Sequence, residues 1–126
     1  MQNIIFDSFI NKYGARLYTP DGLGPFPSVI IVKQFEEKKD EPSLEFYATK
    51  MNEIGFLAFT FICIAEKQIE TLHTHISLAI DYLTTKSEVD KKKIFLLIAD
   101  RDNIQDININ VFDDRIQALA SLSWLA

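Results

Sequence analysis

The chain has 126 residues, a net charge of −5 and 48% apolar residues, ten of them phenylalanine. This length predicts a single domain over residues 1–126 with a substantial core, and the negative charge argues against a nucleic-acid partner, whose phosphates require a basic face. No apolar stretch approaches the roughly 18–20 residues of a membrane span, no signal peptide is recognisable, and a single cysteine, Cys63, excludes an internal disulfide. We therefore expect a cytoplasmic protein that binds neither membrane nor nucleic acid.

The chain begins with two predicted strands, residues 2–9 and 13–19, joined by a tight turn at Asn11 and Lys12. Apolar and polar residues alternate in the second of them, which is typical of a half-exposed antiparallel strand. Residues 20–27 follow as a loop dense in glycine and proline.

Three apolar runs, residues 28–32, 56–62 and 94–99, are rich in β-branched and aromatic residues and predict buried parallel strands. Helices are predicted between them over residues 42–54 and 68–84, because apolar residues recur there at three- and four-residue spacing. The alternation of strands and helices predicts a three-layer α/β domain with a mostly parallel sheet, right-handed crossovers and an N-terminal antiparallel pair at one edge.

The first helix is expected to take its N-terminal cap from Asp40 or Glu41, with Pro42 in the first turn, and to end at Gly55. Its predicted buried stripe consists of Leu44, Tyr47, Ala48, Met51 and Ile54. In the second helix, His73 and His75 point about 200° apart. His73 lies beside the apolar stripe and is expected to pack in the core.

Three further segments are less regular. Lys91–Lys93 is expected to form a solvated turn before the last parallel strand. Residues 104–112 predict a short strand or an irregular crossover, and residues 116–126 predict a last strand or a short helix. In parallel sheets ligands bind beyond the carboxyl ends of the strands, so the decisive positions are those that follow Val32, Ile62 and Ala99.

The order and spacing of several motifs resemble the N-terminal half of an α/β-hydrolase of the dienelactone-hydrolase or serine-aminopeptidase-like type. They span essentially the whole chain in register: Tyr-Gly-Ala-Arg-Leu-Tyr-Thr-Pro-Asp-Gly at 13–22, then residues 25–32, 39–42, 55–59, 79–83 and 114–119. The resemblance implies a truncated α/β-hydrolase-like fold.

The chain departs from this family where the family carries its chemistry. An oxyanion loop of His-Gly-x-Gly-Gly type is replaced by residues 33–37, and residues 63–67 replace a glycine-rich loop after the next strand. The nucleophile elbow Gly-x-Ser-x-Gly is replaced by residues 98–102, with Asp100 at the position of the serine. All four glycines lie at or before Gly55, and the later strands that carry the acid and histidine are not present. The resemblance therefore implies that no catalytic residue carries over.

Two catalytic alternatives remain open. Asp100 is a candidate nucleophile, because some α/β-hydrolases use an aspartate at the elbow, although no histidine lies near it in the sequence to activate water. Asp100 and Asp102 are also candidate ligands for Mg²⁺, the one cofactor considered, because they place hard oxygen donors at a strand end. Ser121 and Ser123 are expected to have structural roles.

The C-terminal segment is apolar and predicts an exposed hydrophobic edge, which usually leads to self-association. Its candidate interface residues are Leu119, Leu122, Trp124 and Leu125. We therefore expect a homo-oligomer, a dimer in the simplest case, and a catalytically inactive domain that acts in oligomerisation or protein binding. The alternatives are a residual hydrolase or Mg²⁺-dependent phosphoryl-transfer enzyme at Asp100 and Asp102, and an engineered minimal scaffold without a biological function.

Overall fold

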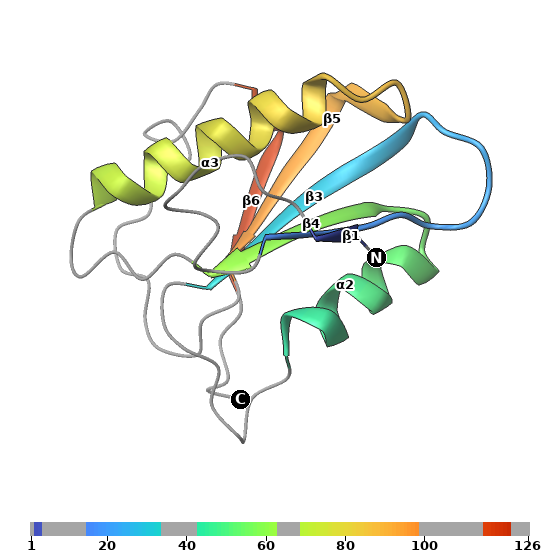
Figure 1. Cartoon of the computed structure of the whole chain (residues 1–126), viewed down its shortest axis with the longest axis horizontal. Helices are drawn as coiled ribbons and strands as arrows, with labels where there is room; N and C mark the ends of the chain where they lie inside the picture. Colours follow the sequence, from blue (N-terminus) through green and yellow to red (C-terminus); the bar gives the residue numbers. More distant parts are fainter. Residues whose placement is uncertain (1, 4–14, 34–42, 63–68, 99–114, 122–126) are drawn as a thin grey trace.

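The protein is described by a computed structural model that covers residues 2–3, 15–33, 43–62, 69–98 and 115–121, with the backbone alone at 2–3, 69–74 and 118–121. A six-stranded sheet lies between two helices (Figure 1), and its strands follow the order β1-β2-β4-β3-β5-β6. The predicted α/β architecture is therefore confirmed. None of the described helices is long and apolar enough to cross a membrane.

The sheet is parallel at its centre and antiparallel at one edge. Strand β3 (Phe26–Lys33) pairs in parallel with both β4 (Leu57–Ile62) and β5 (Val89–Ile98). Strand β2 (Arg16–Tyr18) is antiparallel to β4, and β1 (Gln2–Asn3) is antiparallel to β2. The N-terminal antiparallel pair was predicted correctly, and the rest of its first predicted strand lies outside the described residues.

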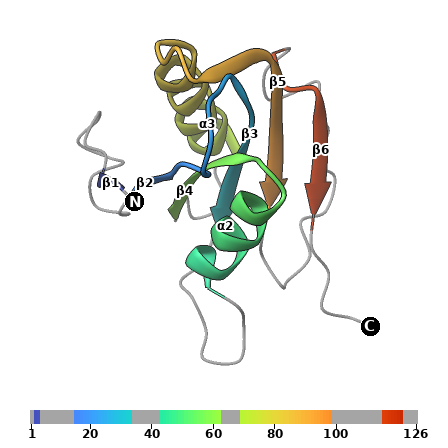
Figure 2. The same ribbon diagram turned by 90° about the vertical axis from the view of Figure 1, so that its right-hand side faces the viewer.

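The two helices cover opposite faces of the sheet (Figures 1 and 2). Helix α2 (Leu44–Glu53) connects β3 to β4, and α3 (Ile69–Thr84) connects β4 back past β3 to β5. These two crossovers run in opposite directions across the sheet, so crossovers of one hand must place their helices on opposite faces. The arrangement agrees with the predicted layering.

Alternate residues of the central strands enter two separate cores. Ile30 and Val32 of β3 belong to the larger core beneath α3, whereas Val29 and Ile31 face the smaller core beneath α2. All four are at most 3% exposed, which explains why β3 is apolar without alternation. Helix α3 contributes a fully buried stripe to the larger core: Ile76, Ala79, Ile80 and Leu83.

The first predicted helix is correct in type and is corrected at its start. Its N-terminal cap is Ser43, whose hydroxyl accepts a hydrogen bond from the amide of Phe46 at 3.1 Å. A cap at Asp40 or Glu41 was therefore wrong, because the nearer hydroxyl already satisfies the free amide of the first turn. Gly55 ends the helix as predicted, with a positive φ of 93°. Ile54 was wrongly placed in the buried stripe and is 66% exposed.

Strand β5 begins five residues earlier than predicted, so Lys91–Lys93 belong to this strand and do not form a turn before it. The C-terminal segment forms a strand, β6 (Ala118–Ser121), which lies parallel to β5 at the sheet edge opposite β1 (Figure 2). Residues 104–112 lie outside the described part of the chain.

Candidate functional site

The sheet brings together the three strand ends at which the sequence predicts a ligand site. Lys33 is paired with Ile62, and Val32 is paired with Ile98, so β3, β4 and β5 finish at the same end of the sheet. The predicted convergence of the segments that follow these strands is therefore supported by the strand register. The segments themselves, residues 34–42, 63–68 and 99–114, lie outside the described residues.

The predicted site residues fall largely beyond the described ranges. Asp100 and Asp102 lie there, so neither the nucleophile nor the Mg²⁺ hypothesis has geometry to assess. Within the described residues, no group of three histidine, cysteine, aspartate or glutamate side chains is arranged to hold a metal ion. Of the predicted interface, Leu119 lies in β6, opposite Leu96 of β5, and the others lie outside the described residues: Leu122, Trp124 and Leu125.

Lys33 lies at the carboxyl end of β3, and the sequence analysis placed it wrongly. The prediction put it in the loop after the first parallel strand, but it is the last residue of β3 and is 1% exposed. Strand alternation puts it on the same side as Ile31, towards the α2 core. A charge is tolerated at such a position only when other groups compensate it, and Lys33 does interact with other groups of the chain.

The histidine that packs near the carboxyl end of β4 is His75, which is 3% exposed. Its ring lies against Phe61 of β4, with the ring centroids 6.3 Å apart and the planes at 77°. The sequence predicted this packing role for His73, whose side chain lies outside the described part. The apolar stripe of α3 is thus wide enough to include position 75. Because Phe61 belongs to the α3 core and Lys33 faces the other core, the sheet separates His75 from Lys33.

The described serines at the sheet and helix termini have structural partners. Ser28 is fully buried and donates a hydrogen bond to the carbonyl of Phe26 at 3.4 Å, and Ser43 caps α2. A hydrolytic serine requires an exposed hydroxyl with a histidine within hydrogen-bond reach. The one histidine whose side chain is described, His75, is 3% exposed and packs against Phe61.

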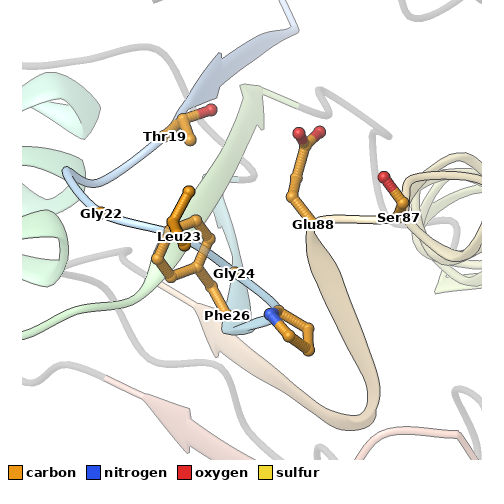
Figure 3. Close-up of a pocket in the computed structure, with 8 residues that line it drawn as sticks. Thr19, Gly22, Leu23, Gly24, Phe26, Ser87 and Glu88 are labelled. Carbon is orange, nitrogen blue, oxygen red and sulfur yellow. The ribbon is translucent and has the colours of Figure 1, made fainter.

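A hollow of about 360 Å³ lies at the opposite end of the sheet, between the loop before β3 and the turn before β5 (Figure 3). Gly24 brings these segments together, since a Cβ there would lie 2.7 Å from the carbonyl oxygen of Glu88. The same oxygen accepts a hydrogen bond from the amide of Phe26 at 2.7 Å. Leu23 at its rim is 97% exposed. The sequence offered only the glycine and proline content of the loop as a sign of this close approach.

Comparison with known proteins yields structural matches alone. No family model matches the sequence, and no curated protein matches it. Among solved structures, the fold is similar to that of the 2,6-dihydroxy-pseudo-oxynicotine hydrolase, with a TM-score of 0.54 and 20% identity over 68% of this chain and 26% of that one.

Two further solved structures are similar. DcsB, in complex with its substrate analogue, has a TM-score of 0.64 and 20% identity over 86% of this chain and 40% of that one. A glucuronoyl esterase from Solibacter usitatus has a TM-score of 0.51 and 15% identity over 69% of this chain and 37% of that one. This chain thus spans less than half the length of these proteins. It has an α/β-hydrolase-like fold that corresponds to part of the fold of these proteins.

Proposed function

We propose that this domain is a catalytically inactive α/β-hydrolase-like module that self-associates through β6. The observation that carries the proposal is the position of β6 in the sheet. It pairs with β5 on one side, and none of the described strands lies on its other side. An unpaired strand edge offers a row of backbone donors and acceptors to another chain.

The residue types of β6 favour pairing with another strand. Natural sheets protect their edges with charges, prolines or bulges, whereas Ala118–Ser121 contains neither a charge nor a proline. In a symmetric dimer the two copies of β6 would meet across a two-fold axis, which requires them to run antiparallel. The apolar residues that follow, among them Leu122, Trp124 and Leu125, would add buried surface to this contact.

The inactive part of the proposal is supported by the histidines. The sequence contains two, and both lie in α3, whereas the resemblance implies a catalytic histidine delivered by a strand. His75 is buried against Phe61. The segment after β5 carries Asp100 where the family has its serine, and no glycine lies beside it.

Self-association is tested by sedimentation equilibrium of the wild type and of Ala120→Lys, which introduces a charge into the edge strand. We expect a dimer for the wild type and a folded monomer for the variant. Gln117→Lys is the matched control, because it adds the same charge at an exposed position just before β6. Circular dichroism melting of each variant confirms that it is folded. A wild type that stays monomeric at high concentration would refute the proposal.

Inactivity is tested separately with p-nitrophenyl esters and phosphates, with and without Mg²⁺. We expect no turnover above that of buffer. Turnover that Asp100→Asn abolishes would instead establish the enzyme hypothesis, because that substitution removes the candidate nucleophile and metal ligand while keeping its size.

A further inference from the structure

The start of β5 contains a basic bulge, Asp90–Lys93. Val89 pairs with Phe26, and Ile94 pairs with Ser28, so four residues of β5 lie opposite the single residue Pro27 of β3. Proline has no backbone N–H and cannot donate to the ladder, which explains why the pairing is interrupted at this position. The extra residues therefore project from the sheet between two fixed pairs.

A side-chain hydrogen bond lies at the base of the bulge. The carboxylate of Asp90 accepts a hydrogen bond from the backbone amide of Lys92 at 3.0 Å. This hydrogen bond constrains the backbone on which the lysines are carried. The three lysines are therefore presented together on the bulge.

The charges of the bulge are not neutralised locally. Lys91, Lys92 and Lys93 are all exposed, and none forms an ion pair within the part of the chain that the structure describes. The neighbouring Lys86 differs, because its ammonium lies 3.5 Å from the carboxylate of Glu88. With Asp90 included, the bulge carries a net charge of +2 on a chain whose total is −5. It is a local positive patch on an acidic protein.

An exposed apolar side chain lies at the same end of the sheet. Leu23 is 97% exposed at the rim of the hollow, whose other wall includes Glu88, two residues before the bulge (Figure 3). The hydrogen bond from the amide of Phe26 to the carbonyl oxygen of Glu88 joins the loop to the turn. The hollow and the bulge are therefore neighbours along the chain, with an apolar side chain at Leu23 and basic side chains at the lysines.

We propose that this surface binds a short acidic segment of a partner protein that also carries an apolar side chain. Carboxylates of the segment pair with the three lysines, and its apolar side chain packs against Leu23 in the hollow. A protein segment fits better than a nucleic acid or an anionic membrane, because those select larger basic clusters, about four to eight residues for lipid, whereas this bulge has three lysines. This surface is separate from β6, and the inference does not rest on the proposed dimer.

Fluorescence anisotropy measures the binding of a short fluorescein-labelled peptide to the full chain. The peptide consists of alternating glutamate and leucine. Its control peptide has glutamine in place of glutamate. We expect the triple variant Lys91→Gln, Lys92→Gln, Lys93→Gln to bind the acidic peptide about tenfold more weakly, since three exposed ion pairs are lost. Higher salt should weaken wild-type binding in the same direction, because the pairs are exposed to solvent.

Four further variants separate charge from other effects. The triple variant Lys91→Arg, Lys92→Arg, Lys93→Arg keeps the charge and should retain affinity for the acidic peptide. Leu23→Ser should lower that affinity a few-fold through lost apolar contact. Lys50→Gln removes an exposed lysine elsewhere, on α2, and should leave binding unchanged. Ala120→Lys should also bind normally, so a failure of the dimer and a failure of this inference remain distinguishable.

The same anisotropy and sedimentation assays are run with a thymidine oligonucleotide and with phosphatidylserine vesicles. Tighter binding of either probe than of the acidic peptide would overturn the inference in favour of a nucleic acid or a membrane. Equal binding of the glutamate and glutamine peptides, an unchanged affinity of the triple glutamine variant, or no binding of the acidic peptide at all would each overturn it as well.

Discussion

The two edges of the sheet are built differently. At one edge, β2 carries the exposed Arg16, and the described part of β1 consists of the two polar residues Gln2 and Asn3. Charged side chains are one device by which proteins stop a sheet from growing. At the other edge, β6 runs parallel to β5 and contains no charged residue. Within the described residues, a charge therefore lies next to the β1 edge, and β6 carries none.

The side-chain interactions described beside the two edges also differ. Asn52 of α2 donates hydrogen bonds to the carbonyls of Tyr18 and Phe56, at 3.1 and 2.8 Å, and so joins the end of β2 to the helix. At the other edge, Arg115 before β6 forms a surface ion pair with Asp81 of α3 at 2.8 Å. The side-chain link described beside β2 thus consists of partly buried hydrogen bonds, whereas the ion pair described before β6 is exposed to solvent.

The largest effect is expected from Leu17→Ala in β2. Leu17 is 2% exposed and belongs to the core beneath α3, so its truncation leaves a cavity and should cost about 3 kcal/mol in the free energy of unfolding. The matched control is Arg16→Ala in the same strand, which is exposed and should stay within about 0.5 kcal/mol of the wild type. Urea denaturation measures both. A loss below about 1 kcal/mol for Leu17→Ala would mean that β2 is not part of the cooperative core.

An intermediate effect is expected from Asn52→Asp. The substitution keeps the shape but replaces the donating amide by a carboxylate oxygen, so two partly buried carbonyls lose their hydrogen-bond donor. The unfolding free energy should fall by about 2 kcal/mol, again measured in urea. Glu53→Gln, at an exposed neighbouring position, serves as the control and should have little effect. Equal stability of the two variants would contradict the difference between the edges.

The elements of the fold were predictable where local sequence and tertiary packing agree. The apolar runs of β3 and β4 are buried on both faces, as a parallel strand between two helices requires. The stripe of α3 is buried at the expected helical spacing, from Ile76 to Leu83. In these segments the apolar residues match their buried environment, so the hydrophobic pattern identified them.

Two of the errors occur where a charged or polar residue enters an apolar environment. Lys33 follows an apolar run and was assigned to a loop, because a lysine ordinarily marks solvent, but its backbone continues the β3 ladder. The packing role in α3 was predicted for His73, and the structure shows His75 packed on Phe61. Lys91–Lys93 were taken as a turn, because a bulge depends on the register with another strand, here at Pro27.

The candidate site was less predictable than the fold. Strand register brings the ends of β3, β4 and β5 together, which the sequence anticipated through topology. The roles of Asp100 and Asp102 depend on segments outside the described residues. Their assignment therefore stays a prediction, as does the contribution of Trp124 to an interface.

The smallest effect is expected at the β6 edge, from the pair formed by Arg115 and Asp81. The two side chains are 38% and 62% exposed, and exposed pairs contribute about 0.2–1 kcal/mol and weaken with salt. Arg115 takes part in a further interaction, so Arg115→Gln alone would overstate the pair. A double-mutant cycle with Asp81→Asn isolates it, and we expect a coupling free energy of about 0.5 kcal/mol that declines in high salt. A coupling above about 2 kcal/mol would exceed the range of an exposed pair and would show that this edge is fixed as firmly as the β2 edge.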